Sequence, residues 1–129
     1  MRNRTIHRIA GAILGLAAAA PAPVAAGDAA SLRQLVVTQC SQCHTFDQGE
    51  PHGQGPNLWG LIGRPAGGAP GYPYSPGFVI AMKGKVWDAA LLDQWLADTT
   101  ALAPQAQMIY FQDDAATRAA LVKFFQSQR

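Results

Sequence analysis

The sequence has few cysteines, no internal repeat and no long apolar run. Two cysteines among 129 residues allow at most one disulfide, and a bridge between these two would close a very short loop and stabilise little. The longest apolar run, Ile9 to Ala20, has twelve residues, which is too short to span a bilayer comfortably. These absences exclude a disulfide framework and leave no predicted membrane span after the N-terminal stretch.

The N-terminus has the pattern of a secretory signal. Three arginines precede the apolar run, and Val24-Ala25-Ala26 supplies the small residues that a signal peptidase reads. We therefore predict a cleaved signal over 1–26 and a periplasmic domain over 27–129. An uncleaved N-terminal anchor is the alternative.

Positive charge is concentrated in that predicted signal. The whole chain has a formal charge of +2, but loss of the three arginines leaves seven basic and eight acidic residues, a charge of −1. Only Lys83, Lys85 and Lys123 remain as lysines. A nearly neutral domain has no electrostatic basis for nucleic-acid binding.

Both cysteines lie in one motif, Cys40-Ser41-Gln42-Cys43-His44. The spacing C-x-x-C-H is typical of c-type haem attachment. Residues three and four apart on a helical turn share a face, so two thiols can meet the vinyl groups of one haem while the imidazole faces its iron. The motif predicts covalent haem c through Cys40 and Cys43, with His44 as an axial ligand.

Three other chemistries use the same residue types. A thioredoxin-like pair needs a strand–turn–helix context, and no β-branched run precedes Cys40. A zinc site built from the motif and His52 would need the adjacent Cys43 and His44 to converge on one tetrahedral ion, which is awkward. A local disulfide is the third alternative.

Helical periodicity predicts three or four helices, hardly any strand and long loops. Asp28 can cap a helix that runs into Cys40, Asp88 one over 89–98, and Asp113 or Asp114 the last helix. A short helix is predicted over 78–83. The segments 49–56, 65–77 and 99–107 are predicted loops, the first two because they are rich in Gly and Pro. Such long loops fit an all-α fold wrapped around a central cofactor.

Three residues are candidates for a second axial ligand: His52, Met82 and Met108. His52 lies close to His44 in sequence, and Met82 is on a predicted helix, where a core methionine is common. Met108 follows a loop that contains Pro104 and is far enough along the chain to reach the opposite haem face. The residue types alone favour Met108 but leave a core role open.

Over essentially the whole predicted mature chain, the sequence resembles the class I c-type cytochromes. The likeness is carried by the C-x-x-C-H motif, the segment GPNLWGLIGR at 55–64, and the pattern Pro104-x-x-x-Met108 before the last helix. It implies an all-α cytochrome c fold around one covalent haem, with His44 and Met108 as axial ligands. A Met/His pair leaves no open position at the iron.

The resemblance also assigns roles to other residues. Pro56 is expected to accept a hydrogen bond from the His44 ring, and Arg64, Trp87 and Tyr74 to contact the haem propionates. His52 occupies a structural position in the family.

The chain departs from the family pattern at five positions. Leu32 replaces a glycine, which predicts a wider or rotated crossing of the first and last helices. Gln105, Ala106 and Gln107 replace Gly-Thr-Lys, and Trp95 stands near the usual tyrosine beside the methionine sulfur. These differences bear on the potential and on loop rigidity rather than on ligation.

The expected function is one-electron transfer between a redox-protein donor and acceptor, without enzymatic activity. One alternative is a haem subunit of a larger periplasmic oxidoreductase, with Tyr72, Tyr74, Phe78 and Tyr110 forming an apolar interface. Another is a haem enzyme or gas sensor, which needs a vacant sixth position. Few lysines predict weak electrostatic steering of partners.

Overall fold

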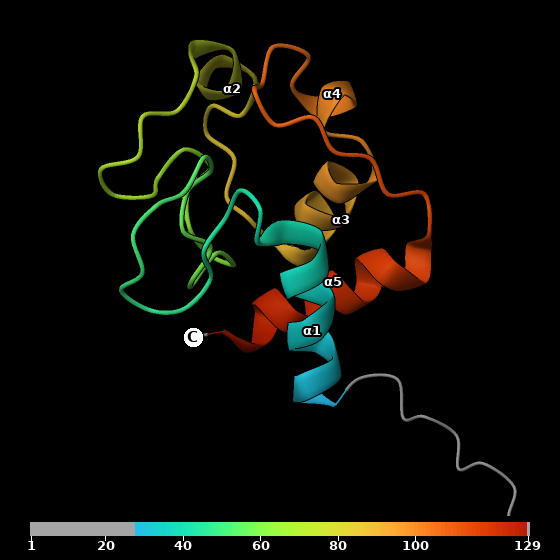
Figure 1. Ribbon diagram of the computed structural model, residues 1–129. Coiled ribbons are helices and arrows are strands. Elements are labelled where there is room, and N and C mark those ends of the chain that lie inside the picture. Colours follow the sequence, from blue (N-terminus) through green and yellow to red (C-terminus); the bar gives the residue numbers. More distant parts are fainter. Residues whose placement is uncertain (1–27, 129) are drawn as a thin grey trace, which may run out of the picture.

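The computed structural model describes residues 28–128, so the predicted signal lies outside the described residues. The described part contains five helices and no strand, which confirms the all-α prediction (Figure 1). The helices are α1 (Ala29–Cys40), α2 (Pro76–Ala81), α3 (Ala89–Ala97), α4 (Thr99–Leu102) and α5 (Ala115–Ser127). Within these residues no helix has both the length and the apolar character to cross a membrane.

Aspartate caps begin the three longest helices, as the sequence predicts. A carboxylate oxygen of Asp28 accepts from the Ser31 amide at 2.7 Å, and one of Asp88 accepts from the Leu91 amide at 2.7 Å. Of the two candidates for the last helix, Asp114 is the cap, bonded to the Thr117 amide at 2.9 Å. Each cap satisfies an amide that has no partner inside the helix.

The predicted number of helices was too low, and both ends of the short helix before Asp88 were misplaced. Residues 99–102, predicted as loop, form α4, because Asp98 ends α3 and then caps a new helical turn. The short helix predicted over 78–83 spans Pro76–Ala81 instead. Proline fits the first turn of a helix, and Ser75 caps it by accepting from the Phe78 amide at 3.3 Å.

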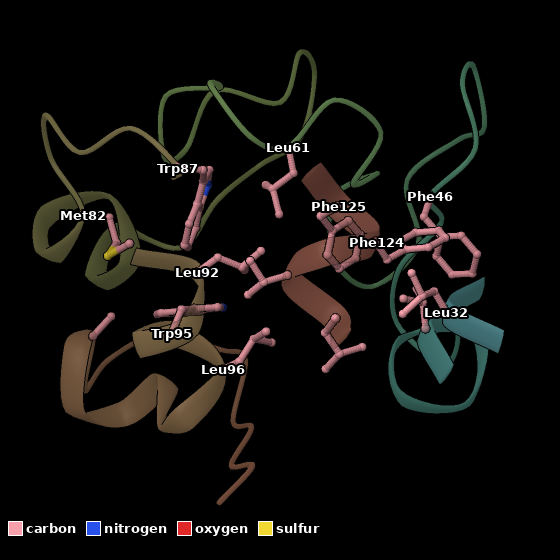
Figure 2. Packing of buried hydrophobic residues seen from close by; sticks show 14 of the residues in the cluster. Leu32, Phe46, Leu61, Met82, Trp87, Leu92, Trp95, Leu96, Phe124 and Phe125 are labelled. Atoms are coloured by element: carbon pink, nitrogen blue, oxygen red, sulfur yellow. The ribbon is translucent and has the colours of Figure 1, made fainter. Parts of the chain in front are cut away.

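The core lies where α5 packs against α1 and α3. Figure 2 shows Leu32, Phe46 and Phe124 gathered at one end of this core, with Met82, Trp87 and Trp95 at the other. The rings of Phe46 and Phe124 meet edge-to-face with centroids 6.2 Å apart. Leu32 is buried here; the effect predicted for it on the helix crossing stays a prediction.

The long segment from α1 to α2 runs beside this core without regular structure (Figure 1). Two isolated bridges fix loop ends, one between Pro65 and Val86 and one between Asp98 and Phe111. The loops therefore have defined positions, and several of them border the cavity described next.

Candidate haem-binding site

The C-x-x-C-H motif sits at the end of α1. The helix ends at Cys40, and a tight turn follows in which the Cys43 and His44 amides both donate to the Cys40 carbonyl, at 3.2 and 3.0 Å. This turn continues the helical spacing just far enough for all three side chains to line one cavity. Both cysteines are free thiols rather than a disulfide.

The imidazole of His44 is held by a backbone carbonyl. Its Nδ1 lies 2.8 Å from the Pro56 carbonyl oxygen, and because a carbonyl only accepts, Nδ1 carries the proton and Nε2 keeps a free lone pair. The pKa of His44 is lowered, mainly because the ring is buried. The hydrogen bond to Pro56 raises the pKa in part, and the nearby Arg64 charge lowers it further. A neutral imidazole with a free Nε2 is the form that binds a metal.

Gly55 is required for this arrangement, although the sequence alone indicated no role of its own for it. A Cβ atom at Gly55 would lie 2.2 Å from Cε1 and 2.7 Å from Nε2 of His44. Contacts this short do not occur in folded proteins, so only glycine lets the ring pack flat against this backbone. The available signals were its place before Pro56 and at the start of the segment 55–64 that carries the family likeness.

The cavity has a volume of about 710 Å³ and is lined mainly by apolar side chains. This size is within the range of cofactor pockets, about 300–1,000 Å³. All eight residues singled out from the sequence line it: Cys40, Cys43, His44, Pro56, Arg64, Tyr74, Trp87 and Met108. Buried apolar residues that the sequence did not assign to the site complete the wall: Leu61, Leu92, Leu96 and Phe125.

The two methionines that were candidates for the iron occupy different places. Met108 lines the cavity, in the segment between α4 and α5. Met82 lies at the end of α2, is fully buried in the core and is not part of the cavity wall. The structure thus brings Met108, and not Met82, to the cavity of His44.

Known proteins with similar sequences are cytochromes, although no protein-family model matches the chain. It is 37% identical to cytochrome c of Nigella damascena over 87 residues, which is 66% of this chain and 75% of that protein. It is 46% identical to cytochrome c-550 of Novispirillum itersonii over 76 residues, 58% of this chain and 68% of that protein. The chain belongs to the class I c-type cytochromes. Cytochrome c2 of Pararhodospirillum photometricum is a further relative, 42% identical over 74 residues, 57% of this chain and 66% of the relative.

Family membership implies covalent haem c, and the buried polar groups of this cytochrome fit such a group. Arg64 and Trp87 are brought together by two backbone bonds, from the Gly63 amide to the Trp87 carbonyl at 2.7 Å and from the Trp87 amide to the Arg64 carbonyl at 3.0 Å. The Arg64 side chain donates to the Asn57 carbonyl at 3.0 Å, but its Nε is buried without a partner. A carboxylate in the cavity would satisfy that donor.

Burial lowers the pKa of the Arg64 guanidinium, yet arginine stays charged at any physiological pH. Its half-buried cation is therefore a fixed positive charge in the cavity wall. Tyr74 lines the same wall, where its hydroxyl accepts from the Ala69 amide at 3.2 Å and its ring stacks on Phe78 at 5.2 Å.

The apolar surface of the cytochrome differs from the prediction. Phe78 is buried between Tyr74 and Trp95, and Tyr72, Tyr74 and Tyr110 are each partly buried. The most exposed apolar side chains are others, with Ile109 82%, Ile80 75% and Phe111 69% exposed, and two of them flank Tyr110. Phe78 therefore cannot belong to an apolar interface, because its ring is packed between Tyr74 and Trp95. The role suggested for the three partly buried tyrosines stays a prediction.

The other chemistries considered for the motif find no support. Both ring nitrogens of His52 are engaged, Nδ1 accepting from the Asn57 amide at 2.9 Å and Nε2 facing the Pro70 carbonyl at 2.9 Å. Within residues 28–128 no group of three or more His, Cys, Asp or Glu side chains could hold a metal ion. Burial, with a smaller effect of Cys43, raises the pKa of Cys40 to about 11, which disfavours the thiolate that redox exchange needs.

Proposed function

We propose that this cytochrome is a periplasmic one-electron carrier that holds a single haem c. Cys40 and Cys43 attach the group, and His44 and Met108 supply its two axial ligands. When bound, the haem supplies an iron that alternates between Fe(II) and Fe(III). The relatives named cytochrome c, c-550 and c2 support electron transfer as the broad function.

The observation that carries the proposal is the convergence of His44 and Met108 on one apolar cavity, next to two free thiols. The Pro56 carbonyl holds the imidazole in its ligating tautomer. Apolar walls exclude water, which limits the change in solvation when the charge at the centre changes. Arg64, with its unpaired Nε, is the proposed partner of a propionate, together with Trp87 and Tyr74.

Export is part of the proposal. The signal over 1–26 would be removed after Ala26, leaving the cytochrome domain over 27–129 in the periplasm, where haem attachment consumes both thiols. These first residues lie outside the described part of the chain.

Optical spectroscopy of the purified protein tests the ligand set. The oxidised protein should show the weak near-infrared band of a methionine-sulfur–iron bond, and Met108→Ala should abolish it. The reduced variant should then bind carbon monoxide at neutral pH, which the parent protein should not. The intact mass of the same sample counts the haems and locates the cleavage site.

Met82→Ala is the matched control. Met82 is fully buried, so its truncation should cost about 2–5 kcal/mol of stability while leaving the band in place. A parent protein without the band, or a band that survives Met108→Ala, would refute His44/Met108 ligation and favour an enzyme or gas sensor with an open sixth position.

A second candidate function is a haem subunit of a larger periplasmic oxidoreductase. The strongly exposed side chains of Ile109 and Phe111 next to Met108 favour it, since clustered apolar surface beside a site is typical of a partner interface. Recovery of the protein in a stable complex of defined stoichiometry from its own cells would support this candidate, and recovery as a free monomer would support the carrier.

A further inference from the structure

Thr99, the first residue of α4, is a fully buried polar residue bonded to the segment of Met108. Its amide donates to the Tyr110 carbonyl at 3.1 Å, and its hydroxyl accepts from the Tyr110 amide at 2.9 Å. The hydroxyl oxygen lies 2.9 Å from the Met108 carbonyl oxygen and 3.3 Å from that of Tyr110. A hydroxyl has one proton, so it donates to the nearer carbonyl, that of Met108.

One side chain thus joins the two peptide groups that follow Met108. The neighbouring side chains of this segment differ in what they contribute: Gln107 is exposed and Ile109 is 82% exposed, whereas the Tyr110 hydroxyl donates to the Gln39 side chain at 3.0 Å. The Tyr110 anchor acts one side chain away from the peptide groups after Met108, whereas the Thr99 hydroxyl bonds those peptide groups directly, with two bonds from inside the protein.

The preceding residue, Asp98, fixes the position of Thr99. The Asp98 carboxylate caps α4 by accepting from the Thr100 and Ala101 amides at 2.9 and 3.2 Å. The backbone bridge between Asp98 and Phe111 closes the same loop on its other side. The backbone at Asp98 and Thr99 is therefore fixed by several hydrogen bonds. The segment that contains Met108 is hydrogen-bonded to this fixed backbone and to the Thr99 side chain.

We infer that the Thr99 hydroxyl is a positioning group that keeps Met108 at the iron and limits spontaneous opening of this segment. The inference rests on the proposed ligation by Met108. Without the hydroxyl, the Met108 carbonyl and the Tyr110 amide lose their buried partner and regain hydrogen bonds only when the segment opens to water. The loss therefore favours local opening rather than global unfolding.

Displacement of the methionine by cyanide measures that opening. The oxidised holoprotein is mixed with excess cyanide, at concentrations where opening limits the rate, and compared with Thr99→Val and Thr99→Ser. The valine variant keeps the shape but not the hydroxyl, and its rate should rise at least about tenfold, because two buried hydrogen bonds are lost. The serine variant keeps the hydroxyl and should stay within about twofold of the parent.

Thr100→Val is the matched control. Thr100 neighbours Thr99 in α4 but is exposed, and its hydroxyl bonds the Asp98 carboxylate rather than the segment of Met108. It should leave the cyanide rate unchanged. A parent-like rate in Thr99→Val overturns the inference, and equal acceleration in the valine and serine variants also overturns it, because methyl packing would then be the cause.

The near-infrared band separates this inference from the proposed function. If the parent protein lacks the band, the proposed ligation fails and the inference falls with it; if the band is present but the rates do not respond, only the inference fails.

Should Thr99→Val yield no holoprotein, amide hydrogen exchange measured in the parent protein decides. A Tyr110 amide that exchanges at the rate of cyanide-limited opening supports the role of Thr99, and one that exchanges like an exposed amide overturns it.

Discussion

At the scale of single residues, Gly55 leaves no room for a side chain beside the His44 ring. Gly55→Ala would place a Cβ atom 2.2 Å from Cε1 of the imidazole, so the ring must leave the Pro56 carbonyl or the loop must move. Overpacking of this kind costs about 1–3 kcal/mol. We expect a lower yield of holoprotein, reduced stability and an altered haem spectrum, measured by denaturant unfolding and optical absorption.

Gly49→Ala is the control for backbone effects. Gly49 has φ of +80°, and no atom lies within 4 Å of the point that its Cβ would occupy. Alanine there is therefore strained only in its own backbone, at a cost of about 1 kcal/mol. It should lower stability without changing the spectrum. An unchanged spectrum in Gly55→Ala would show that the ring tolerates the added carbon.

Residues with a chemical signature could be predicted from the sequence, and residues with a purely geometric role could not. The C-x-x-C-H spacing singled out Cys40, Cys43 and His44 because haem attachment needs those residue types at that spacing, and all three line the cavity. Gly55 lies in the segment that carries the family likeness, but neither it nor Thr99 has a reactive or ligating side chain that would indicate a role. Their importance arises from loop paths that bring His44 against one and the peptide groups after Met108 against the other.

At the scale of elements, helix starts were easier to predict than short helices. Asp28 and Asp88 cap the helices predicted for them because a carboxylate before an apolar stripe is a strong local signal. Helix α4 has four residues, too few for periodicity, and helices this short depend on tertiary contacts. Its buried Thr99 supplies such contacts, which no local pattern indicates.

The contact between α3 and α5 is expected to depend on Arg118. Its Nε lies 2.9 Å from a carboxylate oxygen of Asp93, and its Nη1 donates to the Gln112 and Asp113 carbonyls at 2.9 and 3.0 Å. The Arg118 side chain is only 15% exposed, so Arg118→Ala should lower the free energy of unfolding by about 1–3 kcal/mol. Denaturant titration of the holoprotein measures this.

Arg33→Ala provides the comparison. Arg33 pairs with Asp47 on the surface, where the two side chains are 47% and 43% exposed, and such pairs contribute little and are screened by salt. Its effect should be clearly smaller than that of Arg118 and should shrink further with added salt. Equal losses in the two variants would mean that burial does not determine the strength of these pairs.

At the scale of the whole molecule, the family resemblance predicted which segments surround the cavity better than it predicted the outer surface. The cavity wall joins α1, the segment 54–64, α3 and the segment around Met108, and each has a motif or apolar stripe in the sequence. Which apolar side chains face outward depends on how the rings of Tyr74, Phe78 and Trp95 pack together, and that packing leaves no trace in a local pattern.

The cavity lining is nearly free of charged side chains, which leads to a prediction about electron transfer. Among the described residues that line the cavity, Arg64 alone is permanently charged, and four glutamines contribute to the lining: Gln39, Gln42, Gln54 and Gln107. Steering of a charged partner needs a local field, which salt then screens. Ferricyanide, an anion, and tris(phenanthroline)cobalt(III), a cation, should therefore react at rates that change less than about threefold between roughly 0.05 and 0.5 M salt.

A variant with added charge shows whether the assay can detect steering. Gln42→Lys combined with Gln107→Lys places two cations on exposed positions of the cavity lining. Stopped-flow rates with the anion should then fall as salt is added, and rates with the cation should rise, because screening removes attraction in one case and repulsion in the other. A steep salt dependence in the parent protein would mean that charges away from the cavity steer its partners, and the uncharged lining would then not describe the docking surface.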